Sequence, residues 1–508
     1  MKRNETYIKK AGELFPKLNE TEVRVQGYIT PVERDDDFTA EPSENGFLEE
    51  GDSLYMDFGD HFTGYLSFFT DTEGAHPDAP VLLRITFAER LSEFFEDASE
   101  YQGWVSKAWI QQETIHIDIK DIPGRYTLNR RAAFRYVKVE VLAMSRRFKL
   151  LIREAEVLAV SSADDSLLSP CRSEDPLLRD LDRIAIRTLH ECMQSVFEDG
   201  PKRDRRLWIG DLRLEALANY ETYGMNSLVK QGLYLFAADT MENGQVASNI
   251  FIEPSIEADD TAMFDYALFF PAILRDYVNA TGDRDTLTDL YDTALRQIEI
   301  AGESLGSDGL VHDSDVLGWC FLDWNMNLNK QAGAQGVYLY ALLAMSELAR
   351  LCGREEDEKE LLSLHEKGAE AAKKLLFSKE KGLFVSGKEK QISYASQCWL
   401  ILGGAVSSME EEAKILHTLK NTPEAEGMVT PYMYHHYIDA LLKAGLTEEA
   451  KTVLKEYWGG MRDAGADTFF ELYRPGYPNE SPYGGTIVNS YCHAWSCAPA
   501  YFIRKYGW

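Results

Sequence analysis

The chain has 508 residues, in which 83 aspartates and glutamates outnumber 53 lysines and arginines and give a formal charge of −30. A single hydrophobic core rarely grows beyond about 250–300 residues, so this length predicts at least two domains. The negative charge repels the phosphates of nucleic acids and of anionic membranes, which excludes both as partners. The sequence contains neither an apolar leader nor a run of about 18 uncharged apolar residues, so we expect a cytoplasmic protein.

The first 160 residues alternate apolar and polar residues over short runs, as β-strands do. Examples are "VLLRITFAE", "TIHIDIKD" and "FRYVKVEVL", with glycine, proline and aspartate between the runs. We predict a β-sandwich domain over residues 1–160 and a linker over 161–176, where "SSADDSLLSPCRSEDP" is polar and has no periodicity. The seven cysteines are scattered along the chain, which predicts reduced thiols.

Residues 177–508 have a helical pattern, which predicts twelve helices. Their expected starts lie near residues 175, 211, 226, 262, 284, 330, 356, 393, 409, 430, 447 and 484. Helices charged on one face, such as "EDEKELLSLHEKGAEAAKKLLF", alternate with helices that are apolar nearly all round, such as "QAGAQGVYLYALLAMSELA". Hairpins of one outer and one inner helix bury their apolar faces by closing into a ring, so we predict an (α/α)6 barrel of six helical hairpins.

The loops before the inner helices are crowded with carboxylates and large aromatics. They include "DGPKRDRRLWIGD" at 199–211, "FIEPSIEADD" at 251–260, "GWCFLDWNMN" at 318–327 and "GADTFFELYRPGYPNESPYGG" at 465–485. Such loops converge at one end of a barrel, so residues far apart in sequence can share one pocket. Carboxylates accept hydrogen bonds from sugar hydroxyls, and aromatic faces stack on sugar C–H faces, so the loops favour a carbohydrate as the partner. The alternative interpretation is a set of solvated loops.

The stretch "DGPKRDRRLWIGD" resembles the signature of the α-L-rhamnosidase-type six-hairpin glycosidases, glycoside hydrolase family 78. Further stretches agree with that family in order and type: residues 259–283, "FLDW" at 321–324, "GADTFFELYRP" at 465–475 and "NSYCHAWSCAPAYF" at 489–502. The resemblance implies an inverting, exo-acting glycosidase that releases terminal α-L-rhamnose or a similar deoxysugar. It also implies that two carboxyl groups, about 6.5–9.5 Å apart, flank the glycosidic bond.

The resemblance places the proton donor at Asp204 and the base at Glu471. The positions that it implies for substrate binding are Asp199, Arg203, Trp208, Asp211, Phe264, Asp265, Asp323, Trp324 and His493. Asp204 is one methylene shorter than the Glu that the family usually has as donor, and Phe264 stands at a wall position that is commonly Trp. We also expect a trimmed architecture, because no C-terminal β-domain follows the last helix.

Several of these residues also have a purely structural interpretation. Glu471 would pair with Arg474, and Asp204 would form an ion pair within its charged loop. Asp211 stands where the N-cap of the second helix is expected. His493 would be a hydrogen-bonded core residue of the last inner helix.

No metal or cofactor is predicted. Cys492, His493 and Cys497 would face different sides of one helix, which does not match a zinc site. Other reactions remain open for the same fold, namely phosphorolysis, elimination by a lyase or hydrolysis of a different sugar, because the barrel hosts several chemistries. A further alternative is an inactive sugar-binding relative, and the sequence leaves the oligomeric state open.

Overall fold

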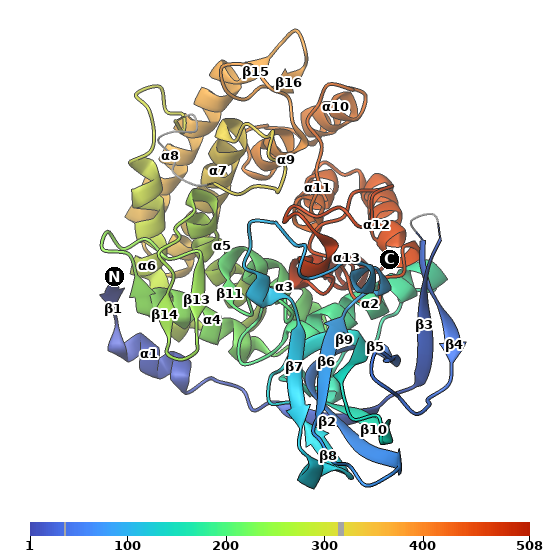
Figure 1. Cartoon of the computed structure of the whole chain (residues 1–508). Helices are drawn as coiled ribbons and strands as arrows, with labels where there is room; N and C mark the ends of the chain where they lie inside the picture. The colour runs from blue at the N-terminus through green and yellow to red at the C-terminus, as the bar shows by residue number, and fades with distance from the viewer. Residues whose placement is uncertain (35–36, 313–319) are drawn as a thin grey trace.

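The computed structural model describes residues 1–34, 37–312 and 320–508 and divides the chain into a β-rich part and a helical part (Figure 1). The β-rich part, here called the β-domain, contains nine strands. They are β2 (Asn19–Arg24), β3 (Gly27–Arg34), β4 (Asp37–Ser43), β5 (Ser53–Gly74), β6 (Val81–Ala88), β7 (Gln112–Ile117), β8 (Gly124–Thr127), β9 (Ala132–Ala143) and β10 (Phe148–Ser161).

Strand β5 organises the β-domain because it changes neighbours along its length. Its first residues pair with β9 on one side and β3 on the other, whereas residues 64–74 pair with β10 and residues 67–70 with β8. Buried and less buried residues alternate along its first half, so that Leu54, Met56 and Phe58 point into the core. The predicted β-rich domain is confirmed. Its finer arrangement as two stacked sheets, and the domain boundaries, stay predictions.

The described residues of the helical part, here called the helical domain, form twelve helices after residue 175. They are α2 (Pro176–Cys192), α3 (Ile209–Glu221), α4 (Asn226–Ala238), α5 (Phe264–Thr281), α6 (Arg284–Gly302), α7 (Gln331–Leu351), α8 (Glu355–Leu375), α9 (Tyr394–Leu402), α10 (Met409–Lys420), α11 (Pro431–Lys443), α12 (Thr447–Asp463) and α13 (Ala498–Tyr506).

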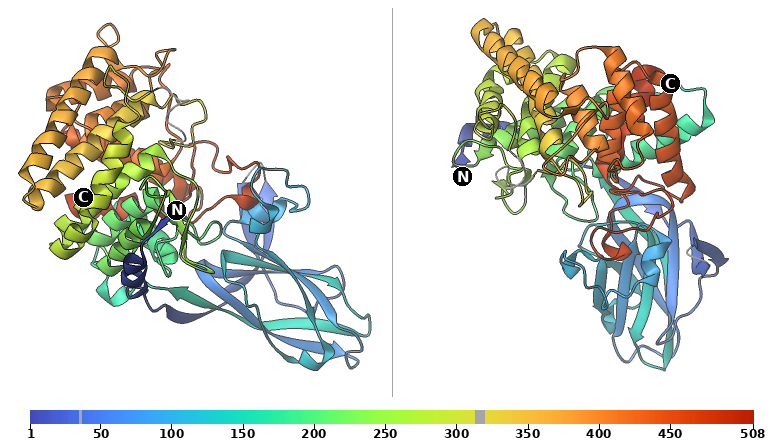
Figure 2. Two further views of the ribbon diagram at one scale, coloured as in Figure 1. Left: turned by 90° about the vertical axis from the view of Figure 1, so that its left-hand side faces the viewer. Right: turned by 90° about the horizontal axis from the view of Figure 1, so that it is seen from above.

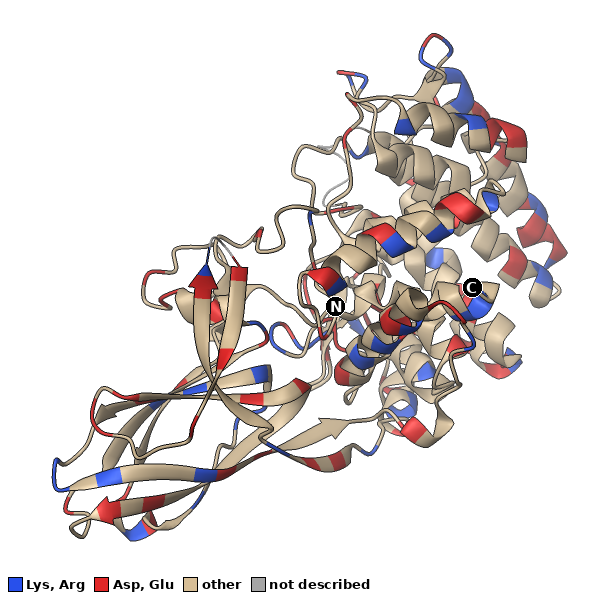
Figure 3. Ribbon diagram, turned by 90° about the vertical axis from the view of Figure 1, so that its right-hand side faces the viewer, with Lys and Arg blue, Asp and Glu red and all other residues tan. Residues whose placement is uncertain are grey.

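Alternate helices form an inner ring, as the sequence predicts. Each of α3, α5, α7 and α9 packs against the next inner helix, the last of these being α11. The 3-10 turn Ala494–Ser496 contacts both α11 and α3, and α13 packs against α3, which closes the ring. Inner α7 is buried along nearly its whole length, whereas outer α8 buries only Leu361, Gly368 and Ala372. Charged residues of both signs are scattered over the helices and the strands in Figure 3. No helix in the described ranges is long and apolar enough to span a membrane.

The last helix begins at Ala498, so the predicted start near residue 484 is wrong. Residues 484–497 instead form an irregular segment with two short 3-10 turns, Thr486–Val488 and Ala494–Ser496. Pro499 explains the difference, because proline fits the first turn of a helix but breaks the hydrogen bonding of a helix interior. His493 therefore lies before the last helix and not on it.

The N-terminal segment was not predicted to be helical, yet it packs on the helical domain. Strand β1 (Lys2–Arg3) pairs with β12 (Asp239–Thr240), and α1 (Glu5–Gly12) packs against α4. The β-domain follows in sequence and projects from the helical domain in both views of Figure 2. Both ends of the chain thus lie against the helical domain.

Candidate active site

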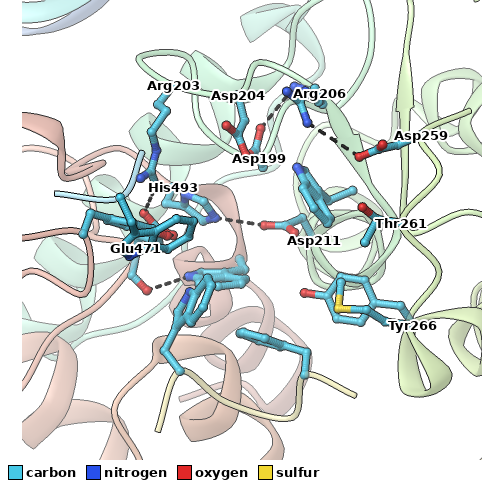
Figure 4. A pocket seen from close by; sticks show the side chains of 17 residues that line it. Asp199, Arg203, Asp204, Arg206, Asp211, Asp259, Thr261, Tyr266, Glu471 and His493 are labelled. Carbon is cyan, nitrogen blue, oxygen red and sulfur yellow. Dashed lines mark hydrogen bonds and ion pairs between the residues drawn. The ribbon is translucent and has the colours of Figure 1, made fainter. Parts of the chain in front are cut away.

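A cavity of about 240 Å³ is formed by loops of the helical domain and one loop of the β-domain (Figure 4). The residues that line it are Trp104, Asp199, Arg203, Asp204, Arg206, Trp208, Asp211, Asp259, Thr261, Met263, Tyr266, Phe321, Trp324, Glu471, Tyr483, His493 and Trp495. Apart from Trp104, they come from the loops before α3, α5, α7 and α13 and from the first turns of α3 and α5, so the inner-helix loops do converge on one pocket. The volume lies below the range usual for drug-sized ligands, which favours a small ligand such as one sugar ring.

The loop before α3 carries two acids, Asp199 and Asp204, on a tight turn. The Asp199 amide donates to the Arg206 carbonyl at 3.0 Å, and the Arg206 amide donates back to the Asp199 carboxylate at 3.2 Å. Asp204 and Arg205 both have positive φ, 63° and 55°, a conformation that costs non-glycine residues free energy and recurs at functional sites. Burial raises the pKa of Asp199 well above its ordinary value, and the carboxylates of Asp204 and Asp211 raise it further.

Glu471 lies deeper in the cavity and is only 4% exposed. Its carboxylate accepts hydrogen bonds from the Arg203 guanidinium and the Tyr483 hydroxyl, while its carbonyl accepts one from the Trp495 indole at 2.9 Å. Burial would raise the pKa of Glu471, but Arg203, His493 and the Tyr483 hydrogen bond lower it below the ordinary value. Glu471 is therefore held as a carboxylate.

A third acid, Asp211, is paired with His493. Their Oδ1 and Nε2 atoms are 3.1 Å apart, and the two side chains point toward one another in Figure 4. Burial raises the pKa of Asp211, and His493 opposes that shift. A Cβ atom on Gly200 would lie 2.7 Å from the Ser490 hydroxyl and 3.2 Å from the His493 ring, so only glycine lets these two loops approach each other.

Two buried hydrogen-bond donors in the cavity have no protein partner within the described part of the chain. They are Nη1 of Arg203 and Nε1 of Trp324. Such groups are costly to bury unpaired, so a ligand with several hydroxyl acceptors fits them. Aromatic rings form the walls around them, with Trp208 and Tyr266 6.4 Å apart on one side.

The comparisons with known proteins agree with this geometry. Residues 168–506 match the profile of the bacterial alpha-L-rhamnosidase 6 hairpin glycosidase domain, and residues 28–159 match that of the glycosyl hydrolase family 78 alpha-rhamnosidase N-terminal domain. The chain belongs to glycoside hydrolase family 78.

Solved structures of rhamnosidases resemble this glycosidase over most of its length. A rhamnosidase from Klebsiella oxytoca with rhamnose bound is 44% identical, with a TM-score of 0.96 and coverage of 100% of this chain and 99% of the other. A family 78 rhamnosidase of Bacillus sp. GL1 is 22% identical, with a TM-score of 0.75 and coverage of 91% and 47%. No protein with a curated description matches the chain.

Most of the family 78 residues implied by the sequence do lie in the cavity. The implied residues that line the cavity are Asp199, Arg203, Asp204, Trp208, Asp211, Trp324, Glu471 and His493. Asp211 is not the N-cap of α3, because Trp208 has that place and Asp211 lies in the first turn. Glu471 pairs with Arg203, whereas Arg474 pairs with Glu480.

Asp323 does not line the cavity, which corrects the prediction that it would. Its carboxylate accepts hydrogen bonds from the amides of Val429 and Thr430 at 2.9 and 3.1 Å, and burial raises its pKa to about 6. Asp265 likewise accepts from two amides, of Phe321 and Leu322. Phe264 is buried in the core of the helical domain. These implied binding residues lie behind the walls of the pocket.

Sequence reasoning missed Trp104 and Tyr483 as pocket residues. Tyr483 lies within the loop 465–485, but nothing in the sequence distinguishes it from the other tyrosines of that loop. Trp104 comes from the β-domain, where strand periodicity says nothing about a loop that reaches another domain. Only the three-dimensional arrangement places it beside Trp324, with ring centroids 6.4 Å apart.

A segment of the β-domain, residues 89–96, contacts the loops that line the cavity. Here it is called the bridging segment. Glu93 pairs with Lys202, and Glu89 accepts a hydrogen bond from the Tyr491 amide at 2.7 Å. Glu96 accepts from the amides of Thr486 and Ile487 at 2.7 and 3.0 Å. The loops that carry Arg203, Tyr483 and His493 are thus each tied to the β-domain.

Proposed function

We propose that this family 78 glycosidase is an exo-acting α-L-rhamnosidase that inverts the anomeric centre. Family membership supports hydrolysis of a glycosidic bond, and the similar Klebsiella oxytoca protein, which has rhamnose bound, supports rhamnose or a similar deoxysugar as the glycone. The small cavity supports binding of one terminal sugar ring.

The observation that carries the mechanism is the contrast between two acids of one cavity. Glu471 is buried beside Arg203 with a lowered pKa, so it is the base that takes a proton from water. Asp199, next to the proposed donor Asp204, has a raised pKa because it is buried and close to the carboxylates of Asp204 and Asp211. A carboxylate held at Glu471 and a proton held at Asp199 beside Asp204 are the protonation states that a base and a neighbouring proton donor need.

The other polar groups bind and orient the sugar. Arg203 holds Glu471 with one nitrogen and has its Nη1 free for a hydroxyl, and Trp324 offers its indole N–H. Asp211 and His493 form a second polar pair on the cavity wall. Each would be satisfied by a hydroxyl of the glycone, while Trp208 and Tyr266 cover its apolar face.

The test is hydrolysis of α-L-rhamnosides followed by NMR, in which the first-formed sugar should be the β-anomer. Asp204→Asn should lose about 10²- to 10⁴-fold in kcat on unactivated rhamnosides and far less on aryl rhamnosides, which need no protonation. Glu471→Gln should fail on both. Asp463→Asn, an exposed control, should keep full activity.

Three outcomes would contradict parts of this proposal. First-formed α-rhamnose would exclude inversion. Full activity of Asp204→Asn on unactivated substrate would remove Asp204 as donor. A well-folded protein that is silent on all rhamnosides, or that acts only with phosphate, would exclude the proposed reaction.

A further inference from the structure

Trp104 is an exposed indole held at the mouth of the cavity. Among the described residues that line the cavity, Trp104 is the only one from the β-domain. Trp104 is 67% exposed. The residues at the bottom of the cavity, such as Glu471 and His493, are by contrast buried. A large apolar side chain that is both exposed and at the mouth of a pocket marks a surface for a ligand.

The position of Trp104 is fixed by its contacts. Its indole N–H donates to the Pro482 carbonyl at 2.9 Å, and its ring lies 5.2 Å from that of Tyr483. The neighbouring residues are equally constrained, because the Tyr101 hydroxyl donates to the Tyr483 carbonyl at 2.7 Å and a Cβ on Gly103 would lie 1.8 Å from the same oxygen. The indole is thus held before a ligand arrives, which lowers the entropic cost of binding.

Trp104 is also linked to both proposed catalytic acids through Tyr483. The Tyr483 hydroxyl donates to Glu471. Burial raises the pKa of Tyr483, Arg203 opposes that shift, and the charges of Glu471 and Asp204 add to it, so both acids lie within electrostatic reach of the ring on which Trp104 packs. An exo-acting enzyme encloses the terminal sugar, and the leaving group must therefore extend through the mouth. Trp104 lies where that group emerges.

We propose that Trp104 is a binding platform for the leaving group, and that the substrates of this enzyme carry a ring with a flat face next to the scissile bond. The ring is either an aromatic aglycone or a second sugar, since both stack on an indole. This inference rests on the proposed function. It makes the β-domain a contributor to substrate preference.

The experiment compares Trp104→Ala with the parent on three substrates: methyl α-L-rhamnoside, 4-nitrophenyl α-L-rhamnoside and a rhamnosyl-glucose disaccharide. We expect KM to rise about 3- to 12-fold for the two substrates with a ring and to stay unchanged for the methyl glycoside. Trp104→Phe should recover most of the loss. The matched control is Tyr477→Ala, because Tyr477 is equally exposed, at 67%, but does not line the cavity.

An increase for only one of the two rings supports the platform and identifies which ring it takes. Equal losses on all three substrates, or no change on any, would overturn it, because the former indicates a role in supporting the 482–484 loop. A parent protein that hydrolyses none of them refutes the proposed function instead. In that case calorimetry tests the role of Trp104, by measuring the affinity of the parent and of Trp104→Ala for 4-nitrophenyl α-L-rhamnoside. Equal affinities, or no binding by either protein, would overturn the platform.

Discussion

Replacing Lys202 by methionine would remove the cation from the buried charge cluster between the two domains. Lys202 and Glu93 are each 1% exposed, and the Lys202 ammonium lies 3.7 Å from a second carboxylate, that of Glu89. Removing one partner of a buried pair costs about 3–5 kcal/mol, because the remaining charge has no compensation. The loop that carries Arg203 and Asp204 would also lose its anchor, and a displacement of about 1 Å can cost about 10²-fold in rate.

The pH dependence makes this prediction specific. Burial raises the pKa of Glu93 to about 7 from an ordinary value of 4.5, despite Lys202. Folding therefore retains a proton that the unfolded chain has lost, and the stability that Glu93 contributes falls as pH rises through this window. Without Lys202 the pKa of Glu93 rises further, so the destabilisation by Lys202→Met should be small near pH 5 and grow toward pH 8.

The assay is urea unfolding followed by tryptophan fluorescence at several pH values, together with kcat on a rhamnoside. Adding Glu93→Gln to Lys202→Met should recover part of the stability, because the uncompensated carboxylate is gone. Lys373→Met, which breaks an exposed pair with Glu411, serves as the control and should cost less than about 1 kcal/mol. Equal unfolding midpoints for Lys202→Met and the parent at pH 8 would refute the reasoning.

Three further predictions concern single residues around the site. Gly200→Ala should lower kcat at least about 10-fold, because its Cβ would meet the Ser490 hydroxyl at 2.7 Å. The control Gly427→Ala, whose Cβ would have no atom within 4 Å, should keep the parent's kcat. Equal kcat values for the two variants would contradict the expected clash. Glu215→Gln should be more stable than the parent at pH 8 but not at pH 5, which thermal unfolding would detect. The reason is that burial raises the pKa of Glu215 well above its ordinary value, and neither carboxylate oxygen has a hydrogen-bond partner in the described chain. Asp265→Ala should destabilise the protein by about 1–3 kcal/mol per amide left unpaired and weaken rhamnose binding, which calorimetry and urea unfolding can measure together. An Asp265→Ala protein with the parent's midpoint would show that water replaces the carboxylate.

The helical ring could be predicted from sequence because burial on all sides forces inner helices to be apolar all round. Helix α7 shows this clearly, and its start at Gln331 lies one residue from the expected one. The start of the last helix could not be predicted, because residues 484–497 are as apolar as a buried helix but do not form one. Apolar composition reports burial, and only Pro499 indicated where the helix begins.

The site was predictable where chemistry and sequence order combine, as for Asp199 and Glu471 in their loops. It was not predictable for Asp323, because a buried carboxylate binds backbone amides as readily as sugar hydroxyls and the sequence looks the same. Nor could Trp104 or the bridging segment be found, since contacts between residues more than a hundred positions apart leave no local pattern. The donor role of Asp204 stays a prediction.

The docking of the N-terminal segment on the helical domain has a consequence for synthesis on the ribosome. Helix α1 is made before its partner α4, which ends at Ala238, and the strands of the β-domain, which end at Ser161, lie between them in sequence. At about 5–20 residues per second, translation needs about 4–15 s to pass from the end of the β-domain to the end of α4. Throughout that interval the β-domain is able to fold, whereas the amphipathic α1 has no complete α4 to pack against. Helix α1 therefore docks only after the β-domain and α4 have both been made, although it precedes both in sequence.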